Sequence, residues 1–259
     1  TQVGSSAASD VYKRQRHSST VGVTNFLSSF MGTHLEKEIK ALEGVLNNPN
    51  KPVAAIIGGS KVSTKIDVIN FLLKKMDIII IGGAMANTFV SAKGLDVGKS
   101  LFEKECIDLA KELIEKSQNN NCNLILPTDF IVSKNLKKNA EYTTANFDSL
   151  PHNMMALDIG PKSIELINKN INNCKTILWN GPLGAFETYP FDKGTNKVAS
   201  YVSSLTKQKK ILSVAGGGDT VSALNNAKVL NDFSYVSTAG GAFLEWLEGK
   251  VLPGIEPIS

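Results

Sequence analysis

Two lysines four residues apart stand in a glycine-containing turn, GGSKVSTK, at residues 58–65. If a helix begins near Ser60, the ammonium groups of Lys61 and Lys65 lie on one helix face. Neighbouring positive charges disfavour each other unless an anion lies between them, so the pair suits a polyphosphate; a solvated lysine face is the alternative. The spacing matches neither the P-loop nor the dinucleotide-binding fingerprint.

A second turn offers backbone donors followed by a carboxylate and a hydroxyl. Gly216, Gly217 and Gly218 precede Asp219 and Thr220 at an expected helix start. Glycine allows positive φ and lets a phosphate reach backbone N–H groups at the positive end of a helix. As an alternative, Asp219 or Thr220 is simply a helix cap. A carboxylate beside phosphates can also hold Mg²⁺, directly or through water, which makes Asp219 the candidate metal ligand.

Two further turns complete the candidate site. Gly240 and Gly241 stand at a helix start suited to an anion, although close packing of that helix on a sheet would also explain them. The stretch WNGPLGAFE, residues 179–187, combines a rigid proline, two glycines, apolar walls and one carboxylate. That mixture suits a base-and-ribose pocket in which Glu187 accepts hydrogen bonds from sugar hydroxyls; a plain Gly-Pro turn is the alternative.

The elements that must position these turns follow a repeating pattern. Six short apolar runs end in a glycine turn or a polar loop, and most are followed by a helical pattern; they lie at residues 53–57, 77–81, 123–126, 176–179, 211–215 and 235–237. Because parallel strands need crossover connections, the pattern predicts an α/β fold: a doubly wound, mostly parallel sheet with helices on both faces, a Rossmann-like three-layer arrangement. Ligands of such a sheet bind beyond the carboxyl ends of the strands. Residues 140–157 fit an antiparallel excursion.

A long amphipathic helix is expected before the first strand. Between Val21 and Leu46 the apolar residues recur at three- and four-residue spacing, and the sequence NNPNKP then stops the helix. The first fifteen residues show no apolar period of either kind and are expected to be a non-native leader, a cloning or assembly remnant.

The bulk composition argues against several classes of partner. The 259 residues carry a formal net charge of +4, with both signs interspersed along the chain, so the sequence predicts neither nucleic-acid nor membrane binding. The longest aliphatic run, residues 78–81, is far too short to cross a bilayer. Cys106, Cys122 and Cys174 lack the paired spacing of a zinc site and fit free thiols in a reducing cytoplasm, the expected location.

Five motifs, taken together and in order, resemble the nucleotide-domain motifs of the phosphoglycerate kinase family. They are GGSKVSTKI, GGAMANTF, WNGPLGAFE, AGGGDTVSAL and STAGGAFLEWLEGKVLPG, and the resemblance runs from about Arg16 to the C-terminus. It implies a phosphotransferase with a carboxyl-group acceptor, which transfers a phosphoryl group reversibly from 1,3-bisphosphoglycerate to ADP and yields 3-phosphoglycerate and ATP in glycolysis. The implied cofactors are Mg²⁺ and ADP or ATP, and the complete enzyme is expected to be a monomer.

The resemblance also implies a role for each matching residue. Lys65, with Lys61 nearby, binds the nucleotide phosphates and stabilises the transferring phosphoryl group. The implied catalytic positions are Lys61, Lys65, Gly218 and Gly241. The implied nucleotide-binding positions are Lys61, Lys65, Gly82, Gly83, Asn180, Pro182, Gly184, Ala185, Glu187, Gly216, Gly217, Gly218, Asp219, Thr220 and Gly240. Direct in-line transfer needs charge neutralisation and positioning rather than a covalent nucleophile, which these residue types supply.

The expected organisation has four parts: a leader at 1–15, a remnant of an N-terminal domain with an interdomain helix at 16–50, a nucleotide-binding domain at 51–245 and a C-terminal tail at 246–259. The family carries its phosphoglycerate site on a separate N-terminal domain rich in Arg and His. Only residues 16–19, RHSS, resemble the closing motif of that domain, and Gln15 stands where the family has arginine. We therefore assign no phosphoglycerate-binding residue and expect this chain to bind Mg-nucleotide without turning over alone.

Two other functions compete with this interpretation. A non-catalytic nucleotide-binding or interaction module, which docks to a partner through the long helix, is the alternative. A nicotinamide-dependent dehydrogenase suits the fold class, but it would need a GxGxxG motif and an acidic ribose anchor that the sequence lacks.

Overall fold

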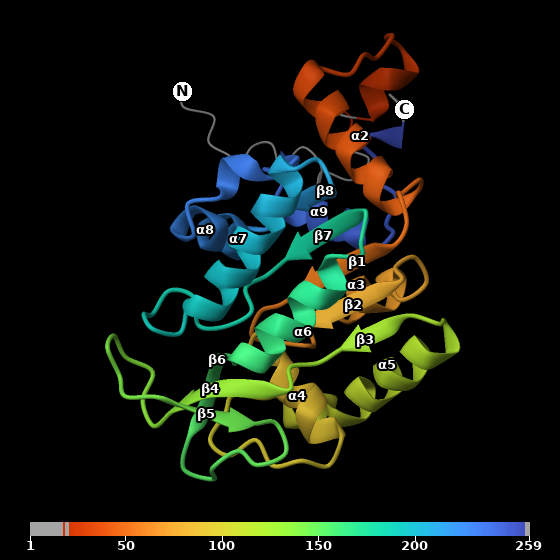
Figure 1. Ribbon diagram of the computed structural model, residues 1–259. Helices are drawn as coiled ribbons and strands as arrows, with labels where there is room; N and C mark the ends of the chain where they lie inside the picture. The colour runs from red at the N-terminus through yellow and green to blue at the C-terminus, as the bar shows by residue number, and fades with distance from the viewer. Residues whose placement is uncertain (1–17, 19–20, 257–259) are drawn as a thin grey trace.

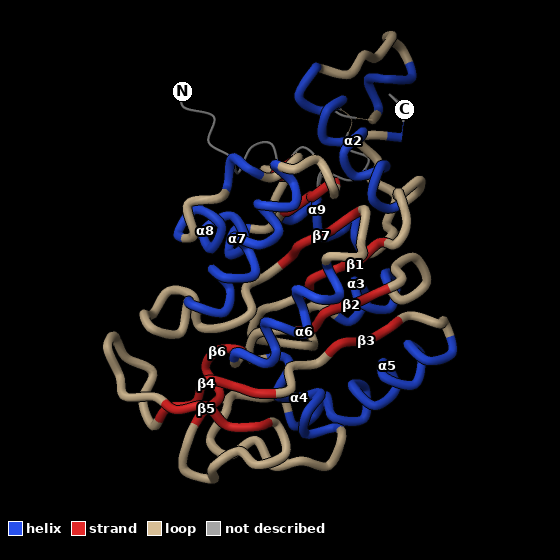
Figure 2. The backbone as a smooth tube through the Cα atoms, in the orientation of Figure 1, coloured by secondary structure: helices blue, strands red, loops and turns tan. Residues whose placement is uncertain are grey.

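A parallel sheet of six strands forms the centre of the molecule (Figures 1 and 2). The computed structural model describes residues 18 and 21–256. The strands are β1 (Val53–Ile57), β2 (Ile78–Ile81), β3 (Asn123–Ile125), β7 (Thr176–Asn180), β8 (Leu212–Ala215) and β9 (Tyr235–Val236), in the order β3-β2-β1-β7-β8-β9. All neighbouring pairs are parallel. The six runs predicted from the sequence are confirmed as these strands.

Helices cover both faces of this sheet. They are α3 (Ile66–Leu72), α4 (Met85–Ala92), α5 (Ile107–Asn119), α6 (Pro161–Ile171), α7 (Lys193–Lys207), α8 (Gly218–Asn226) and α9 (Gly241–Leu247). Short 3₁₀ helices, which are not among these covering helices, form at η1 (Gly22–Asn25), η2 (Lys104–Cys106) and η3 (Leu230–Asp232). Strand β1 sends Val53 and Ile57 into a core with α3, α4, α5 and α9, and Ala54 and Ile56 into a second core with α6, α7 and α8. Burial on both faces confirms the doubly wound α/β class.

A small antiparallel sheet lies beyond the β3 end of the large one (Figure 2). Its order is β5 (Thr143–Asn146), β4 (Asp129–Ser133), β6 (Met155–Ile159), and both pairs are antiparallel. It has its own core, which includes Phe130 and Val132. The antiparallel excursion predicted for 140–157 is thus confirmed, whereas β4 was not predicted, because its short apolar run follows directly on a polar loop.

The helix before the first strand is shorter than the sequence predicts. Helix α2 covers Thr33–Leu46, whereas Gly22–Asn25 is a 3₁₀ helix and residues 26–32 are not helical. Gly32 precedes α2 in an extended conformation with ψ 153°. The predicted N-terminal half fails because glycine and serine are weak helix formers and the side chains of Phe26 and Phe30, each 87% exposed, gain no packing.

Other expectations concern the two ends of the chain, the three cysteines and membrane-spanning helices. The proposed leader, residues 1–15, and the RHSS motif, apart from Ser18, lie outside the described residues. Leu42 of α2 and Ile255 near the C-terminus pack into the same core as α3 and α9. All three cysteines are buried free thiols, as expected. None of the helices described here is long and apolar enough to span a bilayer.

Candidate nucleotide site

Hydrogen bonds beyond the strand ends set the glycine turns side by side at the carboxyl edge of the sheet. Gly58 N donates to the carbonyl oxygen of Asn180 at 2.9 Å, and Gly82 N donates to that of Ile57 at 2.9 Å. The turns after β8 and β9 are joined to their neighbouring strands in the same way. The turns therefore collect at the edge where open α/β sheets bind ligands.

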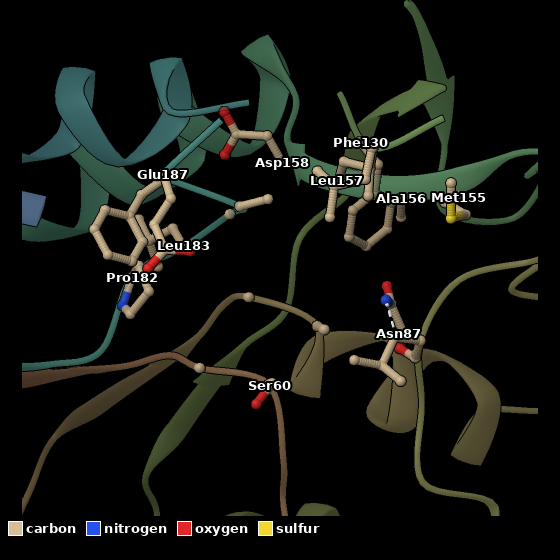
Figure 3. A pocket seen from close by; sticks show the side chains of 18 of the residues that line it. Ser60, Asn87, Phe130, Met155, Ala156, Leu157, Asp158, Pro182, Leu183 and Glu187 are labelled. Atoms are coloured by element: carbon tan, nitrogen blue, oxygen red, sulfur yellow. Dashed lines mark hydrogen bonds between the residues drawn. The ribbon is translucent and has the colours of Figure 1, made fainter. Parts of the chain in front are cut away.

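A pocket of about 300 Å³ lies between these turns and the small antiparallel sheet (Figure 3). We call it the first pocket. Six of the predicted site residues line it: Gly83, Pro182, Gly184, Ala185, Glu187 and Asp219. Its other walls are mainly apolar and include Phe130, Leu157 and Leu183. A concave apolar site with a few polar groups is the common form of a small-molecule site.

The turns after β1 and β7 approach so closely that neither has room for a side chain. A Cβ on Gly58 would lie 1.9 Å from the carbonyl oxygen of Pro182, and a Cβ on Gly181 would lie 2.2 Å from that of Gly58. Gly181 also has a φ of 101°, a left-handed conformation that glycine adopts without strain. Pro182 lines the first pocket, so this backbone contact fixes one of its walls.

Lys65 extends from the β1 turn to the end of β7, where its Nζ donates a hydrogen bond to Oδ1 of Asn180. Burial lowers the pKa of Lys65 to about 8, while the charges of Asp219 and Glu248 act to raise it. An anion beside this ammonium would favour its charged form. The structure therefore brings Lys65, Asn180 and Asp219 together, as the sequence predicts.

Lys61 does not share a helix face with Lys65. Helix α3 begins only at Ile66, so both lysines precede it. Lys61 is exposed and lies near Glu103: burial raises the pKa of Glu103, but hydrogen bonds from Ser63 and the charge of Lys61 lower it overall. Ser63 donates to this carboxylate from N at 2.9 Å and from Oγ at 2.5 Å. Glu103 thereby holds the loop in a non-helical conformation. Because no helix begins near Ser60, the ammonium groups of Lys61 and Lys65 are not paired on one helix face.

Asn180 and Thr220 join the turns to one another. Asn180 Nδ2 donates to the carbonyl oxygen of Gly216 at 2.7 Å, and Gly181 N donates to Oγ1 of Thr220 at 2.7 Å. Both side chains are buried. Each thus has a structural partner that holds the β7 and β8 turns in register, in addition to any contact with a ligand.

A second cavity, of about 780 Å³, borders the turns after β8 and β9, and Gly217, Gly218 and Gly240 are among the residues that line it. Gly217 and Gly240 have φ values of 96° and 55°, and each directly precedes a helix, α8 or α9. Gly241, the first residue of α9, lines neither this cavity nor the first pocket. The N-terminus of α8 is the better placed of the two for a phosphate, because it lies between the two cavities.

Two of the predicted glycines have a packing role and do not line the first pocket or the second cavity. A Cβ on Gly82 would lie 2.2 Å from the side chain of Leu183, and a Cβ on Gly216 would lie 2.7 Å from the ring of Phe243. The packing alternative therefore explains these positions without a ligand.

One buried carboxylate at the first pocket was not predicted. Asp158 in β6 accepts a hydrogen bond from Gly194 N at 2.6 Å, and its carboxylate is turned away from the pocket (Figure 3). Burial raises the pKa of Asp158 to about 8, against the effect of that hydrogen bond. A single Asp in a strand gives no sequence signal, because it is indistinguishable from a solvent-facing residue.

Known proteins share this arrangement. The family model for phosphoglycerate kinase matches residues 10–250. The chain is 50% identical over 240 residues to the phosphoglycerate kinase of Rhizobium meliloti (strain 1021), which is 93% of this chain and 60% of that protein. Its identity to the enzyme of Brucella melitensis biotype 1 is 52% over 240 residues, 93% of this chain and 61% of the relative. The chain thus spans about 60% of the length of these curated relatives.

Solved structures agree with the sequence comparisons. The phosphoglycerate kinase from Coxiella burnetii matches with a TM-score of 0.90 and 40% identity, over 98% of this chain and 68% of that one. The enzyme from Pyrococcus horikoshii OT3 matches with a TM-score of 0.79 and 28% identity, over 97% and 62% of the two chains. Matching motifs, an extensive sequence match and a shared fold lead to one assignment: the chain belongs to the phosphoglycerate kinase family.

Proposed function

We propose that this chain supplies the nucleotide half of a phosphoglycerate kinase, which transfers a phosphoryl group reversibly between 1,3-bisphosphoglycerate and ADP in the cytoplasm. The observation that carries the proposal is the position of Lys65, a half-buried lysine beside Asp219 at the edge where the glycine turns meet. Phosphoryl transfer needs positive charge and backbone donors at such a place. Family membership supports the reaction, and the whole enzyme is proposed to act as a monomer.

The geometry supports a particular placement of the nucleotide. The apolar first pocket would hold the nucleoside, with Glu187 beside the ribose and the α8 turn at Gly217 and Gly218 beside the phosphates. Lys65 would neutralise phosphate charge, and Asn180 would keep the lysine extended toward it. This placement assigns the predicted Gly83, Pro182, Gly184 and Ala185 to the nucleoside wall, a role that we carry forward as part of the proposal.

Mg²⁺ fits this site as a companion of the phosphates. In the described part of the chain no three Asp, Glu, His or Cys side chains form a metal cluster. Mg²⁺ commonly binds through one or two carboxylates together with substrate phosphates rather than in an all-protein cage. Asp219, exposed at the start of α8, is the residue that would hold it, and the ion would offset phosphate charge during transfer.

The domain organisation is proposed on the same basis. Residues 51–245 form the nucleotide-binding domain, residues 16–50 contain the interdomain helix and residues 246–259 form the tail. The packing of Leu42 and Ile255 into the core of this domain indicates that the helix and the tail depend on it for stability.

Titration calorimetry of the chain with MgADP tests the proposed function. We expect saturable one-site binding, and we expect the melting temperature to rise with ligand concentration, since a ligand at about 100 times its Kd stabilises the native state by about 2.7 kcal/mol. ADP without Mg²⁺ should bind more weakly. A folded sample that binds neither form would contradict the proposal.

Gly218→Ala separates phosphate binding from folding. A Cβ at Gly218 meets nothing within 4 Å, and alanine favours helix, so the melting temperature should not fall. If a phosphate approaches the bare backbone at this turn, the methyl group should reduce ADP affinity by about tenfold, the worth of a lost hydrogen bond of about 1.4 kcal/mol. Adenosine, which has no phosphate, serves as the control ligand, and its affinity should not change. Equal ADP affinity in the two proteins would remove Gly218 from the phosphate site.

A further inference from the structure

A groove of about 610 Å³ lies at the amino edge of the large sheet, opposite the edge that carries the nucleotide site. Its lining residues directly precede or begin strands β1, β7, β8 and β9, or end helix α7. Backbone hydrogen bonds join these segments: Lys175 N donates to the carbonyl oxygen of Pro52 at 2.7 Å, and Leu212 N donates to that of Lys175 at 2.8 Å. We call it the lysine groove, because four lysines line it: Lys51, Lys175, Lys209 and Lys210.

Three of these four ammonium groups have no carboxylate partner. Lys51 Nζ pairs with Oδ1 of Asp77 at 3.0 Å, whereas Lys175, Lys209 and Lys210 form no ion pair within the described part of the chain. Among the described residues that line the groove there is no Asp or Glu. Positive charges gathered in a concave surface without acidic neighbours create a potential that concentrates anions.

The end of helix α7 accounts for only part of this cluster. Lysine near the C-terminus of a helix is favourable in itself, because the last carbonyl groups carry partial negative charge. This effect covers Lys209 and Lys210, which follow α7, but not Lys51 or Lys175, which come from other segments. Lys209 also has a φ of 55°, a left-handed conformation for which glycine is the usual residue after a helix. Convergence of three separate segments therefore needs a further explanation.

The charge and volume of the lysine groove define the class of ligand that fits it. Its volume is about twice the 300 Å³ of the first pocket, and three positive charges are left to neutralise. Ser234 also lines the groove; its Oγ accepts a hydrogen bond from Ser213 N at 3.1 Å, so its hydroxyl hydrogen can be donated to a ligand. Lysine binds phosphate well as a point charge.

We propose that the lysine groove is a second anion site, which binds compact polyphosphorylated molecules that carry three or more negative charges. Inorganic tripolyphosphate is the simplest member of this class. The site lies at the opposite edge of the sheet from Lys65 and Asp219, so the proposal does not depend on the proposed nucleotide function.

Calorimetric titration with tripolyphosphate, without Mg²⁺, tests the proposal in the Lys65→Met protein, where the phosphate part of the nucleotide site is weakened. We expect one-site binding that weakens as salt is added, because salt screens contacts between exposed charges. Orthophosphate, which has fewer charges, should bind at least about tenfold more weakly. Addition of Lys175→Gln, Lys209→Gln and Lys210→Gln should lower the tripolyphosphate affinity by about 10- to 100-fold, because three charge contacts are lost together.

The matched control adds Lys93→Gln, Lys99→Gln and Lys169→Gln to the Lys65→Met protein instead. These lysines are exposed and line neither the lysine groove nor the two cavities at the other edge, so the same loss of net charge should change the affinity by less than about threefold. Equal losses in the two triple variants would show that binding follows net charge alone and would overturn the proposal.

Two further measurements separate this site from other binders of phosphate. In the otherwise unmodified chain, the three groove substitutions should leave MgADP affinity unchanged; a loss there would mean that the groove is not a separate site. An oligothymidylate should not displace tripolyphosphate at equal phosphate concentration, and displacement would assign the lysines to nucleic acid. Absence of tripolyphosphate binding by the folded Lys65→Met protein would overturn the proposal and leave the nucleotide function standing.

Discussion

Replacement of Lys65 by methionine is expected to weaken MgADP binding by about 10- to 100-fold, the worth of a hydrogen bond between charged groups. Methionine keeps much of the apolar stem that packs at the end of β7, so the loss reports the ammonium group rather than a cavity. The side chain of Asn180 would also lose its donor. Calorimetric titration of the two proteins measures the effect directly.

Lys61→Met provides the matched control, because the structure separates the two lysines. Lys61 is exposed and lies near Glu103, so its removal should change MgADP affinity by less than about threefold, as for other exposed ion pairs. The affinity for adenosine should be the same in all three proteins. If Lys61→Met proves as damaging as Lys65→Met, the paired-lysine interpretation of the sequence is correct and the division drawn from the structure is not.

The pH dependence of Lys65 gives this prediction a second readout. Burial lowers the pKa of Lys65 to about 8, so above pH 8 binding of the anionic nucleotide must take up a proton and the affinity should fall. The stability of the unliganded protein should change with pH in the opposite direction. Because the unfolded lysine titrates near pH ~10.4, the unfolded state binds more protons between about pH 8 and 10.4, and stability should rise across that window. Both trends should disappear in Lys65→Met; an unaltered affinity profile there would assign the titration to another group.

The parallel sheet could be predicted because its signal is local. Each strand of the large sheet is a short apolar run followed by a turn. Because both faces of these strands are buried, the run can be recognised without an alternation of apolar and polar residues. Strand β4 lacks such a clear boundary, because it begins with the polar residue Asp129 directly after a polar loop. The N-terminal half of the expected helix was wrong for a different reason: Phe26 and Phe30 satisfy the helical spacing, but spacing alone does not supply a surface to pack against.

The candidate site was predictable in its glycine turns and less so in its side chains. Bare glycines beside Asp219 mark backbone that a ligand can approach, and the structure sets those turns at one edge. Asp158 gave no signal, because its importance lies in its burial and in a hydrogen-bond partner from a distant segment. Gly82 and Gly216 show the converse limit: a glycine required for packing looks the same in a sequence as one required for a phosphate.

Gly58→Ala is expected to lower the melting temperature by about 2–12 °C, the largest stability effect of any substitution considered. The new Cβ would lie 1.9 Å from the carbonyl oxygen of Pro182 and 2.9 Å from that of Gly181, and both contacts are with backbone that no rotamer change can move. Overpacking of this kind costs about 1–3 kcal/mol, and 1 kcal/mol corresponds to about 2–4 °C for a chain of this size. Calorimetric melting of the unliganded protein measures the shift.

Gly44→Ala is the matched control, since it makes the same chemical change inside α2. Its Cβ would meet no atom closer than 3.9 Å, and removal of a glycine from a helix interior should stabilise the protein by about 0.5–1 kcal/mol. Melting-temperature shifts of opposite sign in Gly58→Ala and Gly44→Ala would show that the destabilisation at Gly58 arises because the β1 and β7 turns leave no space between them. Because Pro182 also lines the first pocket, any relaxation that relieves the clash must move that wall, and MgADP affinity should fall with stability in Gly58→Ala but not in Gly44→Ala. An unchanged melting temperature in Gly58→Ala would mean that the turns separate freely, and the rigid wall assigned to the nucleoside would then have no structural basis.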